Sequence, residues 1–194
     1  MEILSPASNM EHIDVAIDYK ANAVYGGLKK WNARNKAINF DDNEYNILIE
    51  KLHKHNIKFF LTLNILVFDD EIEEIIEFLK NNSLPDAFIV TDIGLIQRLY
   101  EEFPNVRVFV LTPIQSATPE RNVKNMKLIN QVLRPIAGAF CAQVVDCYNN
   151  SGIIEKFEVI DGQGKYLLDG LHPAYNGQEL QGKYVSKEIK NNIF

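Results

Sequence analysis

The chain is short of cysteine and has no long apolar run. Its 194 residues include two cysteines, Cys141 and Cys147, too few for a disulfide scaffold or for the four thiolates that an iron–sulfur cluster normally needs. Free, buried thiols are the favoured interpretation.

The longest uncharged apolar stretch, residues 59–68, is too short to cross a bilayer, and the N-terminus lacks the features of a secretion signal. We therefore expect a cytoplasmic protein with no membrane partner, no cofactor and no metal site. Three histidines on predicted helices lack metal-ligand spacing and are expected at the surface: His12, His53 and His55.

Basic residues are also in the minority. Lys and Arg number 20 against 26 Asp and Glu, a net charge of −6, which argues against a broad nucleic-acid-binding surface. The charge is uneven along the chain: residues 1–104 carry a net −8 and residues 105–194 a net +2. This asymmetry indicates two parts with different histories.

Residues 1–104 alternate short apolar runs with amphipathic helices, the pattern of parallel α/β folds. Strands are predicted at residues 3–4, 23–25, 58–63 and 87–90. Asn9 is expected to cap a first helix, and Asp41 or Asp42 a second whose apolar side chains recur at i, i+3, i+4 and i+7. Two further helices are predicted around residues 72–79 and 93–102.

The alternation continues beyond residue 105 and then weakens. Strands are predicted at residues 106–111 and 143–145, and a helix at 123–133 that ends by Pro135, because the residue before proline avoids helical geometry. Turn-rich residues 149–170 predict an irregular segment with a short hairpin, and a helix over 177–190 follows. We expect one compact α/β protein, whose two parts share a mainly parallel sheet of roughly six strands.

Several polar residues follow the predicted strands, at the edge where α/β proteins place their sites. We expect Asn64 and Asp92 to bind substrate there, with Asn32 and Arg34 on a neighbouring loop. Arg34 can hold a phosphate or a carboxylate with its two-pronged guanidinium group. In the alternative interpretation, Asn and Asp at these positions only satisfy loop backbone groups and cap the following helices.

The first half resembles a known family. The segments ILSPASNMEHIDVAIDYKANAVYGG, WNAR, FFLTLN and DAFIVTDIGLIQRL are similar to the opening of the collagenase-like peptidases. The resemblance implies a TIM-barrel-like fold, of which residues 1–104 would form the first four βα units. Many members are labelled peptidases, and others are similar to proteins that support hydroxylation of RNA or of ubiquinone precursors through an iron–sulfur cluster. The later cysteine-bearing segments of that family are absent here.

The second half resembles a different family. The segments VRVFVLTPIQSATPERN and AQVVDCY, and above all Asp169-Gly170-Leu171-His172-Pro173, are similar to the C-terminal part of SGNH (GDS-type) esterases, which are flavodoxin-like. The resemblance implies that Asp169 and His172 form the D-x-x-H pair of a serine hydrolase, with His172 as general base and Asp169 as its orienting partner. In the alternative interpretation, His172 is a turn residue before the last helix.

The nucleophile motif of those esterases is missing, since no G-D-S occurs in the chain. Ser5 or Ser8, after the first strand, is the serine best placed to substitute as the catalytic group. The favoured hypothesis is a hydrolase of hybrid ancestry that cleaves a small-molecule ester. The alternatives are a peptidase-family protein acting on a peptide, and a non-enzymatic remnant or binding module. Open strand edges would favour a homodimer.

Overall fold

The computed structural model describes residues 3–33, 37–105, 107–119, 123–139, 142–160, 162 and 164–193. The chain is an α/β protein that divides into two compact units, Met1–Val106 (unit 1) and Arg107–Phe194 (unit 2). No helix in the described part is long and apolar enough to cross a membrane.

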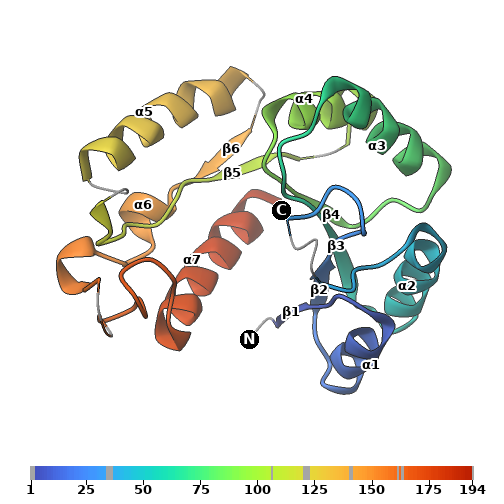
Figure 1. Cartoon of the computed structure of the whole chain (residues 1–194), viewed down its shortest axis with the longest axis horizontal. Coiled ribbons are helices and arrows are strands. Elements are labelled where there is room, and N and C mark those ends of the chain that lie inside the picture. Colours follow the sequence, from blue (N-terminus) through green and yellow to red (C-terminus); the bar gives the residue numbers. More distant parts are fainter. Residues whose placement is uncertain are drawn as a thin grey trace. The chain divides into compact units, whose positions relative to one another are not determined.

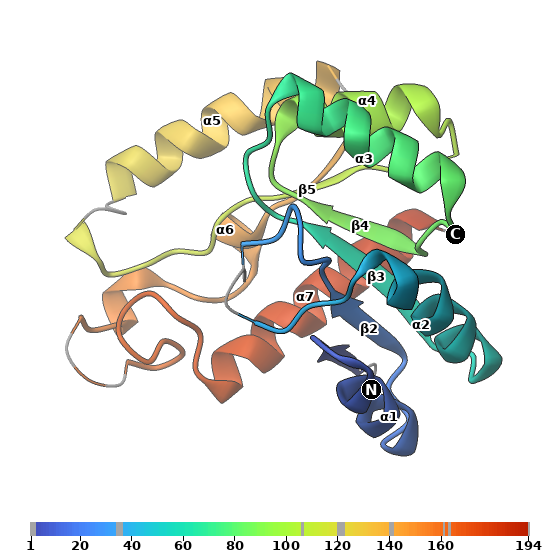
Figure 2. The same cartoon turned by 45° about the vertical axis from the view of Figure 1, so that its right-hand side comes forward.

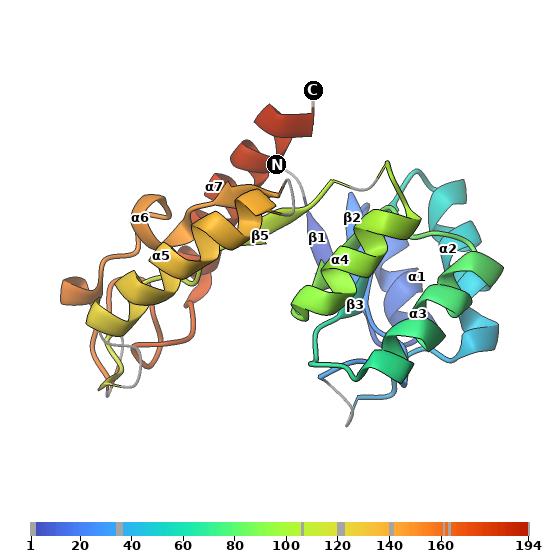
Figure 3. The same cartoon turned by 90° about the horizontal axis from the view of Figure 1, so that it is seen from above.

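Unit 1 is a four-stranded parallel sheet with a helix after each strand (Figure 1). The strands pair in sequence order, so each crossover runs in the same sense and the helices lie along one face of the sheet (Figures 2 and 3). The elements are β1 (Leu4–Pro6), α1 (Met10–Asp18), β2 (Ala23–Gly26), α2 (Asp42–Lys54), β3 (Lys58–Leu63), α3 (Asp69–Asn81), β4 (Ala87–Val90) and α4 (Ile93–Glu102).

Side-chain caps start three of these helices. The Asn9 amide oxygen accepts the N–H of His12 at 2.8 Å, and Asp41 forms a capping box with Glu44 at the start of α2. Asp92 accepts the N–H of Leu95 at 2.9 Å. Each cap satisfies backbone donors that have no partner within the helix. The predicted caps of the first two helices are therefore confirmed.

Alternation along β3 divides the sheet into two faces. Phe59, Leu61 and Leu63 are almost fully buried in the core beneath the helices, where each contributes about 1.5–3 kcal/mol. Successive strand residues point to opposite faces, so Thr62 belongs to the other face. The strand register pairs Thr62 with Ile89 on β4. Polar side chains thus project from the face opposite the helices, toward the carboxyl ends of the strands.

Unit 2 contains a two-stranded parallel sheet and a long C-terminal helix (Figure 1). Its core includes Val145, Cys147 and Leu167, against which Leu180 and Tyr184 of the last helix pack. The elements are β5 (Phe109–Leu111), α5 (Val123–Ala139), β6 (Gln143–Val145), α6 (Cys147–Asn150), the 3-10 turn η2 (Glu155–Phe157) and α7 (Tyr175–Ile193).

Two expectations differ from this structure. The described strands form separate sheets of four and two strands instead of one shared sheet. The helix expected to end by Pro135 continues to Ala139. Pro135 has no N–H to donate within the helix, but the extra turn buries Ala137 to 2% exposure. Arg134, just before the proline, forms an ion pair with Asp146 after β6. These tertiary contacts override the local preference.

The segment over residues 149–170 is irregular, as expected, and is held by contacts other than hairpin strands in its described part. It contains η2, and Leu167 forms an isolated antiparallel bridge with Pro173. The carboxylate of Glu158, which is 7% exposed, accepts the N–H groups of Tyr166 and Leu167. The Glu158 carboxylate therefore accepts backbone N–H groups that the opposite strand of a hairpin would otherwise bind.

Candidate functional site

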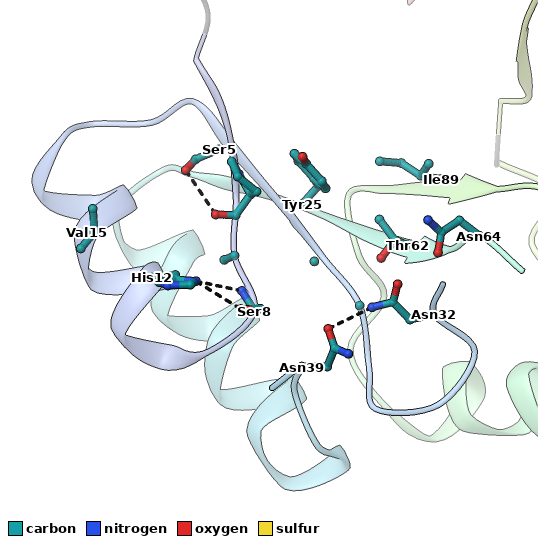
Figure 4. A pocket seen from close by; sticks show the side chains of 14 residues that line it. Ser5, Ser8, His12, Val15, Tyr25, Asn32, Asn39, Thr62, Asn64 and Ile89 are labelled. Carbon is teal, nitrogen blue, oxygen red and sulfur yellow. Dashed lines mark hydrogen bonds between the residues drawn. The ribbon is translucent and has the colours of Figure 1, made fainter. Parts of the chain in front are cut away.

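A pocket of about 470 Å³ lies at the carboxyl ends of the strands of unit 1 (Figure 4). This volume is in the range of small-molecule sites. Its described lining contains amides, hydroxyls and one imidazole, and no Asp, Glu, Lys or Arg. The polar side chains that line it are Ser5, Ser8, His12, Tyr25, Asn32, Asn39, Thr62 and Asn64.

Two glycines form the floor of the pocket. A Cβ atom at Gly27 would overlap the Asn32 amide and lie 2.7 Å from Thr62 Oγ1, and a Cβ at Gly26 would lie 2.7 Å from the Ala7 carbonyl oxygen. Both distances are shorter than any relaxed contact. The Gly26-Gly27 pair at the end of β2 thus lets atoms of neighbouring elements approach the backbone closely.

Amide side chains fix the loop at the edge of the pocket. Asn32 Nδ2 donates to Asn39 Oδ1 at 3.0 Å, and both residues are more than nine-tenths buried. Asn39 adopts a left-handed conformation, φ 51°, which Asn tolerates better than most residues. Asn64 Oδ1 accepts the N–H of Ala33 at 3.0 Å, so its Nδ2 group carries the remaining donors.

Three polar groups facing the pocket have no partner in the described part of the chain. Thr62 is 7% exposed, yet its hydroxyl makes no hydrogen bond, and neither do the Tyr25 hydroxyl and Asn64 Nδ2 (Figure 4). None of these three groups is among the fully enclosed polar atoms without a partner. They are open to the pocket and therefore available to a ligand.

Ser8 and His12 form a contact at the rim of this pocket (Figure 4). Ser8 Oγ lies 3.3 Å from His12 Nδ1, and the Ser8 N–H donates to the same nitrogen at 3.3 Å. Nδ1 therefore acts as an acceptor and the ring proton belongs on Nε2. No carboxylate in the described part is hydrogen bonded to His12. Sequence reasoning missed this contact, although the four-residue spacing across the start of α1 was the available signal.

Some of the remaining predicted site residues line the pocket and others do not. Asn32 and Asn64 line the pocket together with Ser5, whose hydroxyl lies 3.5 Å from the Pro6 carbonyl oxygen. Asp92 caps α4 and is not among the lining residues. Arg34 lies outside the described residues.

Sequence reasoning also missed Tyr25, Asn39 and Thr62. Thr62 of β3 stands two residues before Asn64, which directly follows the strand, and residues two apart in an extended segment lie on one face. That signal was available. Asn39 is distant in sequence from the strand ends, and only the folded loop brings it to Asn32.

Asp169 and His172 lie in unit 2 and form a hydrogen-bonded turn. Asp169 Oδ1 accepts the N–H groups of Leu171 and His172 at 3.0 and 2.7 Å, and Asp169 Oδ2 lies 2.7 Å from His172 Nδ1. These hydrogen bonds, first among them that from the His172 N–H, hold the pKa of Asp169 well below its ordinary value. Both side chains are more than half exposed. The contact expected within D-x-x-H is present, in a turn open to solvent.

Gly170 completes the turn. It has φ +78°, and a Cβ there would lie 2.7 Å from the Val159 carbonyl oxygen. The Ala117 N–H donates to the Gly170 carbonyl at 2.8 Å. These contacts explain the pattern D-G-L-H-P as a turn, independently of any catalytic role of Asp169 and His172.

The thiols do not fit an iron–sulfur cluster. Such a cluster normally needs four thiolates, and Cys141 lies outside the described residues. Cys147 is fully buried, and burial raises the pKa of its thiol to about 11, which disfavours the thiolate that binds metal. Within the described part, no group of three His, Cys, Asp or Glu side chains is arranged to hold a metal ion.

Comparison with known proteins identifies relatives across much of the chain. The family model for peptidase family U32 matches residues 8–132, which extends past residue 105, where the sequence pattern predicted a change of family. The uncharacterized protease MJ0090 of Methanocaldococcus jannaschii is 41% identical over 100 residues, covering 50% of this chain and 24% of that protein. The tRNA hydroxylation protein P of Escherichia coli is 31% identical over 192 residues, covering 98% of this chain and 41% of that protein.

A further relative and a solved structure complete the comparison. The 23S rRNA 5-hydroxycytidine C2501 synthase of Escherichia coli is 32% identical over 124 residues, covering 62% of this chain and 18% of that protein. The esterase domain of the zebrafish ZfL2-1 ORF1 protein matches with 15% identity and a TM-score of 0.39, covering 87% of this chain and 98% of that domain. That likeness is too low to support an argument, and the esterase-type resemblance of residues 105–194 stays a prediction.

The chain spans less than half the length of each of these three sequence relatives. The family model nevertheless covers more than half of the chain and contains all but three of the residues that line the pocket. The chain belongs to peptidase family U32.

Proposed function

We propose that unit 1 binds a nucleobase of RNA in its pocket, as the base-binding part of a U32-type RNA hydroxylation system. Two relatives are named for hydroxylation of tRNA and of a cytidine in 23S rRNA, which favours a pyrimidine over other ligands. No chemical step of hydroxylation is assigned to this chain.

One observation carries the proposal: the unpaired groups of Tyr25, Thr62 and Asn64 face an uncharged pocket. Amides and hydroxyls are the groups that read the edges of unpaired bases in RNA, and an aromatic ring offers a surface for stacking. Phosphates and carboxylates are instead bound through charge-assisted hydrogen bonds, for which the described lining has no permanently charged donor.

The net charge of −8 on residues 1–104 is compatible with this role. Contacts with phosphates dominate the affinity of broad nucleic-acid surfaces, whereas a base pocket works through short-range hydrogen bonds and stacking. Base binding in unit 1 should therefore depend weakly on salt.

Isothermal titration of the full chain with cytidine, uridine and ribose 5-phosphate tests the proposal. We expect the nucleosides to bind and ribose 5-phosphate not to. Thr62→Val keeps the shape of the side chain and removes its unpaired hydroxyl, so it should weaken nucleoside binding about tenfold without lowering Tm. Thr91→Val, at an exposed position outside the pocket, is the matched control. Equal binding of ribose 5-phosphate, or no effect of Thr62→Val, would overturn the proposal.

Hydrolysis is the second candidate, favoured by the 3.3 Å contact between Ser8 Oγ and His12 Nδ1. In this scheme Ser8 attacks an ester or peptide carbonyl, His12 takes the hydroxyl proton and returns it to the leaving group, and water then releases the acyl group. Labelling with a fluorophosphonate probe followed by peptide mapping tests it. Labelling of Ser8 that is lost in His12→Ala supports hydrolysis, and the absence of any labelled serine excludes it.

A further inference from the structure

A second feature lies in unit 2, where two lysines surround an aromatic ring at η2. Lys156 Nζ and Lys165 Nζ lie 5.0 and 5.6 Å from the centre of the Phe157 ring, and Lys165 Nζ lies 4.8 Å from the centre of the Tyr166 ring. These distances allow cation–π attraction. We call Lys156, Phe157, Lys165 and Tyr166 the lysine–aromatic patch.

The backbone beneath the patch is fixed. The Lys165 N–H donates to the Phe157 carbonyl at 3.0 Å, and this bond joins the two sequence segments of the patch. The buried Glu158 carboxylate accepts the Tyr166 N–H at 3.0 Å, so its oxygens point into the loop. A fixed backbone presents the four side chains together without a large ordering cost on binding.

The patch is open to solvent. Phe157 is 47% exposed, both lysines are exposed, and Tyr166 is half-buried. The local acidic side chains are partly occupied elsewhere: Glu158 binds backbone groups, and Asp169 is hydrogen bonded to His172. Half-buried Glu155 on η2 is next to Lys156 in the sequence and adds a negative charge near the patch.

We propose that the lysine–aromatic patch binds single-stranded RNA. Lys156 and Lys165, which lie over the Phe157 ring in the free chain, turn to pair with phosphates, and a base stacks on the ring face that they leave. Sequence-tolerant binding of single strands combines these two elements, an aromatic platform and flanking cations. The charges agree, since residues 105–194 carry a net +2 while residues 1–104 carry −8. The choice of RNA rests on the function proposed for unit 1, and the patch adds a strand contact that the base pocket lacks.

Fluorescence anisotropy with a fluorescein-labelled oligouridine of about 12 nucleotides tests this on the full chain. Phe157→Ala should weaken binding about tenfold through loss of stacking. The double change Lys156→Ala and Lys165→Ala should reduce the slope of log K against log salt by about 1.4. Glu155→Gln should strengthen binding, because it removes the opposing charge.

Two control variants match these changes. Leu168→Ala removes an equally exposed apolar side chain, 47% exposed, and Lys183→Ala removes an exposed lysine of α7 that pairs with Glu179. Both should bind the oligonucleotide like the wild type. A patch variant indistinguishable from its control would overturn the proposal, as would binding to phosphatidylserine vesicles in place of the oligonucleotide.

The outcomes separate the two proposals. Failure of the pocket proposal appears as an absence of nucleoside binding, or as nucleoside binding that Thr62→Val does not change. Failure of the patch proposal appears as oligouridine binding that Phe157→Ala does not change, with nucleoside binding intact. The two variants change different units of the chain and are read with different probes.

Discussion

The Asp169 carboxylate holds His172 by two hydrogen bonds of 2.7 Å, one from its backbone N–H and one shared with ring Nδ1. Sequence reasoning assigned this pair to catalysis. Its hydrogen bonds to the backbone show that the same pair also shapes the turn before α7, with Gly170 in the left-handed region between them.

Gly170→Ala should destabilise unit 2 more than Asp169→Asn. A side chain at φ +78° costs about 1–2 kcal/mol, and the new Cβ would press on the Val159 carbonyl. Asn at position 169 keeps an oxygen that accepts the backbone N–H groups. Thermal melts followed by circular dichroism give the order of the two variants, and equal Tm values would contradict the turn interpretation.

The pH dependence of Asp169→Asn provides a second readout at this turn. The folded pKa of Asp169 lies below its ordinary value, so its stabilising effect is present above that ordinary value, about 3.9, and is lost as the pH falls through the folded pKa. The wild type should thus lose more stability than Asp169→Asn as the pH falls from about 4 to about 2, below the ordinary carboxyl pKa of about 3.9.

Local sequence signals predicted much of unit 1. The 3.6-residue spacing of Leu48 and Leu52 is realised in α2, and β3 and β4 have the bounds that their apolar runs indicated. These elements form where local preference and burial agree. The continuation of α5 through Pro135 was not predictable from local preference, because the added turn is accompanied by the burial of Ala137, which depends on tertiary packing.

The pocket was predicted only in part, because some of its contacts form only when the loop is folded. Strand ends indicated the edge of the sheet, and Asn64 does line the pocket there. The approach of Asn39 to Asn32 and the tight packing over Gly27 arise from the folded loop. No local spacing encodes them.

Gly27→Ala should abolish nucleoside binding. The added Cβ would overlap the Asn32 amide and displace the Thr62 hydroxyl, so the floor of the pocket must move. Crowding in a packed site typically costs about 1–3 kcal/mol, which should also lower the Tm of unit 1. Trp31, the one tryptophan of the chain, lies in unit 1 and reports this melt by fluorescence.

Gly182→Ala is the control for that substitution. Position 182 is within α7, and a Cβ there meets nothing within 4 Å. Alanine should stabilise the helix by about 1 kcal/mol and leave nucleoside binding unchanged. Loss of binding in both variants would show that the effect does not come from the pocket floor.

Tyr45→Phe should stabilise unit 1. Tyr45 is fully buried on α2, and its hydroxyl has no hydrogen-bond partner in the described part. Its ring packs edge-on against Phe59 and Phe78, with centres 6.2 and 5.0 Å away, and phenylalanine keeps these contacts. Removing an unpaired buried hydroxyl should raise the free energy of unfolding by about 1 kcal/mol. A lower Tm by tryptophan fluorescence would show that the hydroxyl has a partner in solution.

Asp146→Asn should destabilise unit 2 at neutral pH and less so in acid. Burial by itself raises the pKa of Asp146, but hydrogen bonds from Asn149, the charge of Arg134 and the Thr112 hydroxyl together bring the pKa below its ordinary value. A carboxylate with a depressed folded pKa stabilises the protein above its unfolded pKa, about 3.9, and loses that effect as the pH falls through the folded value. The Tm difference between wild type and variant should therefore be largest near neutral pH, well above the ordinary pKa of about 3.9. It should become smaller below about pH 4. Thermal melts followed by circular dichroism should detect this difference. A difference that persists in acid would mean that the variant acts through packing instead of charge.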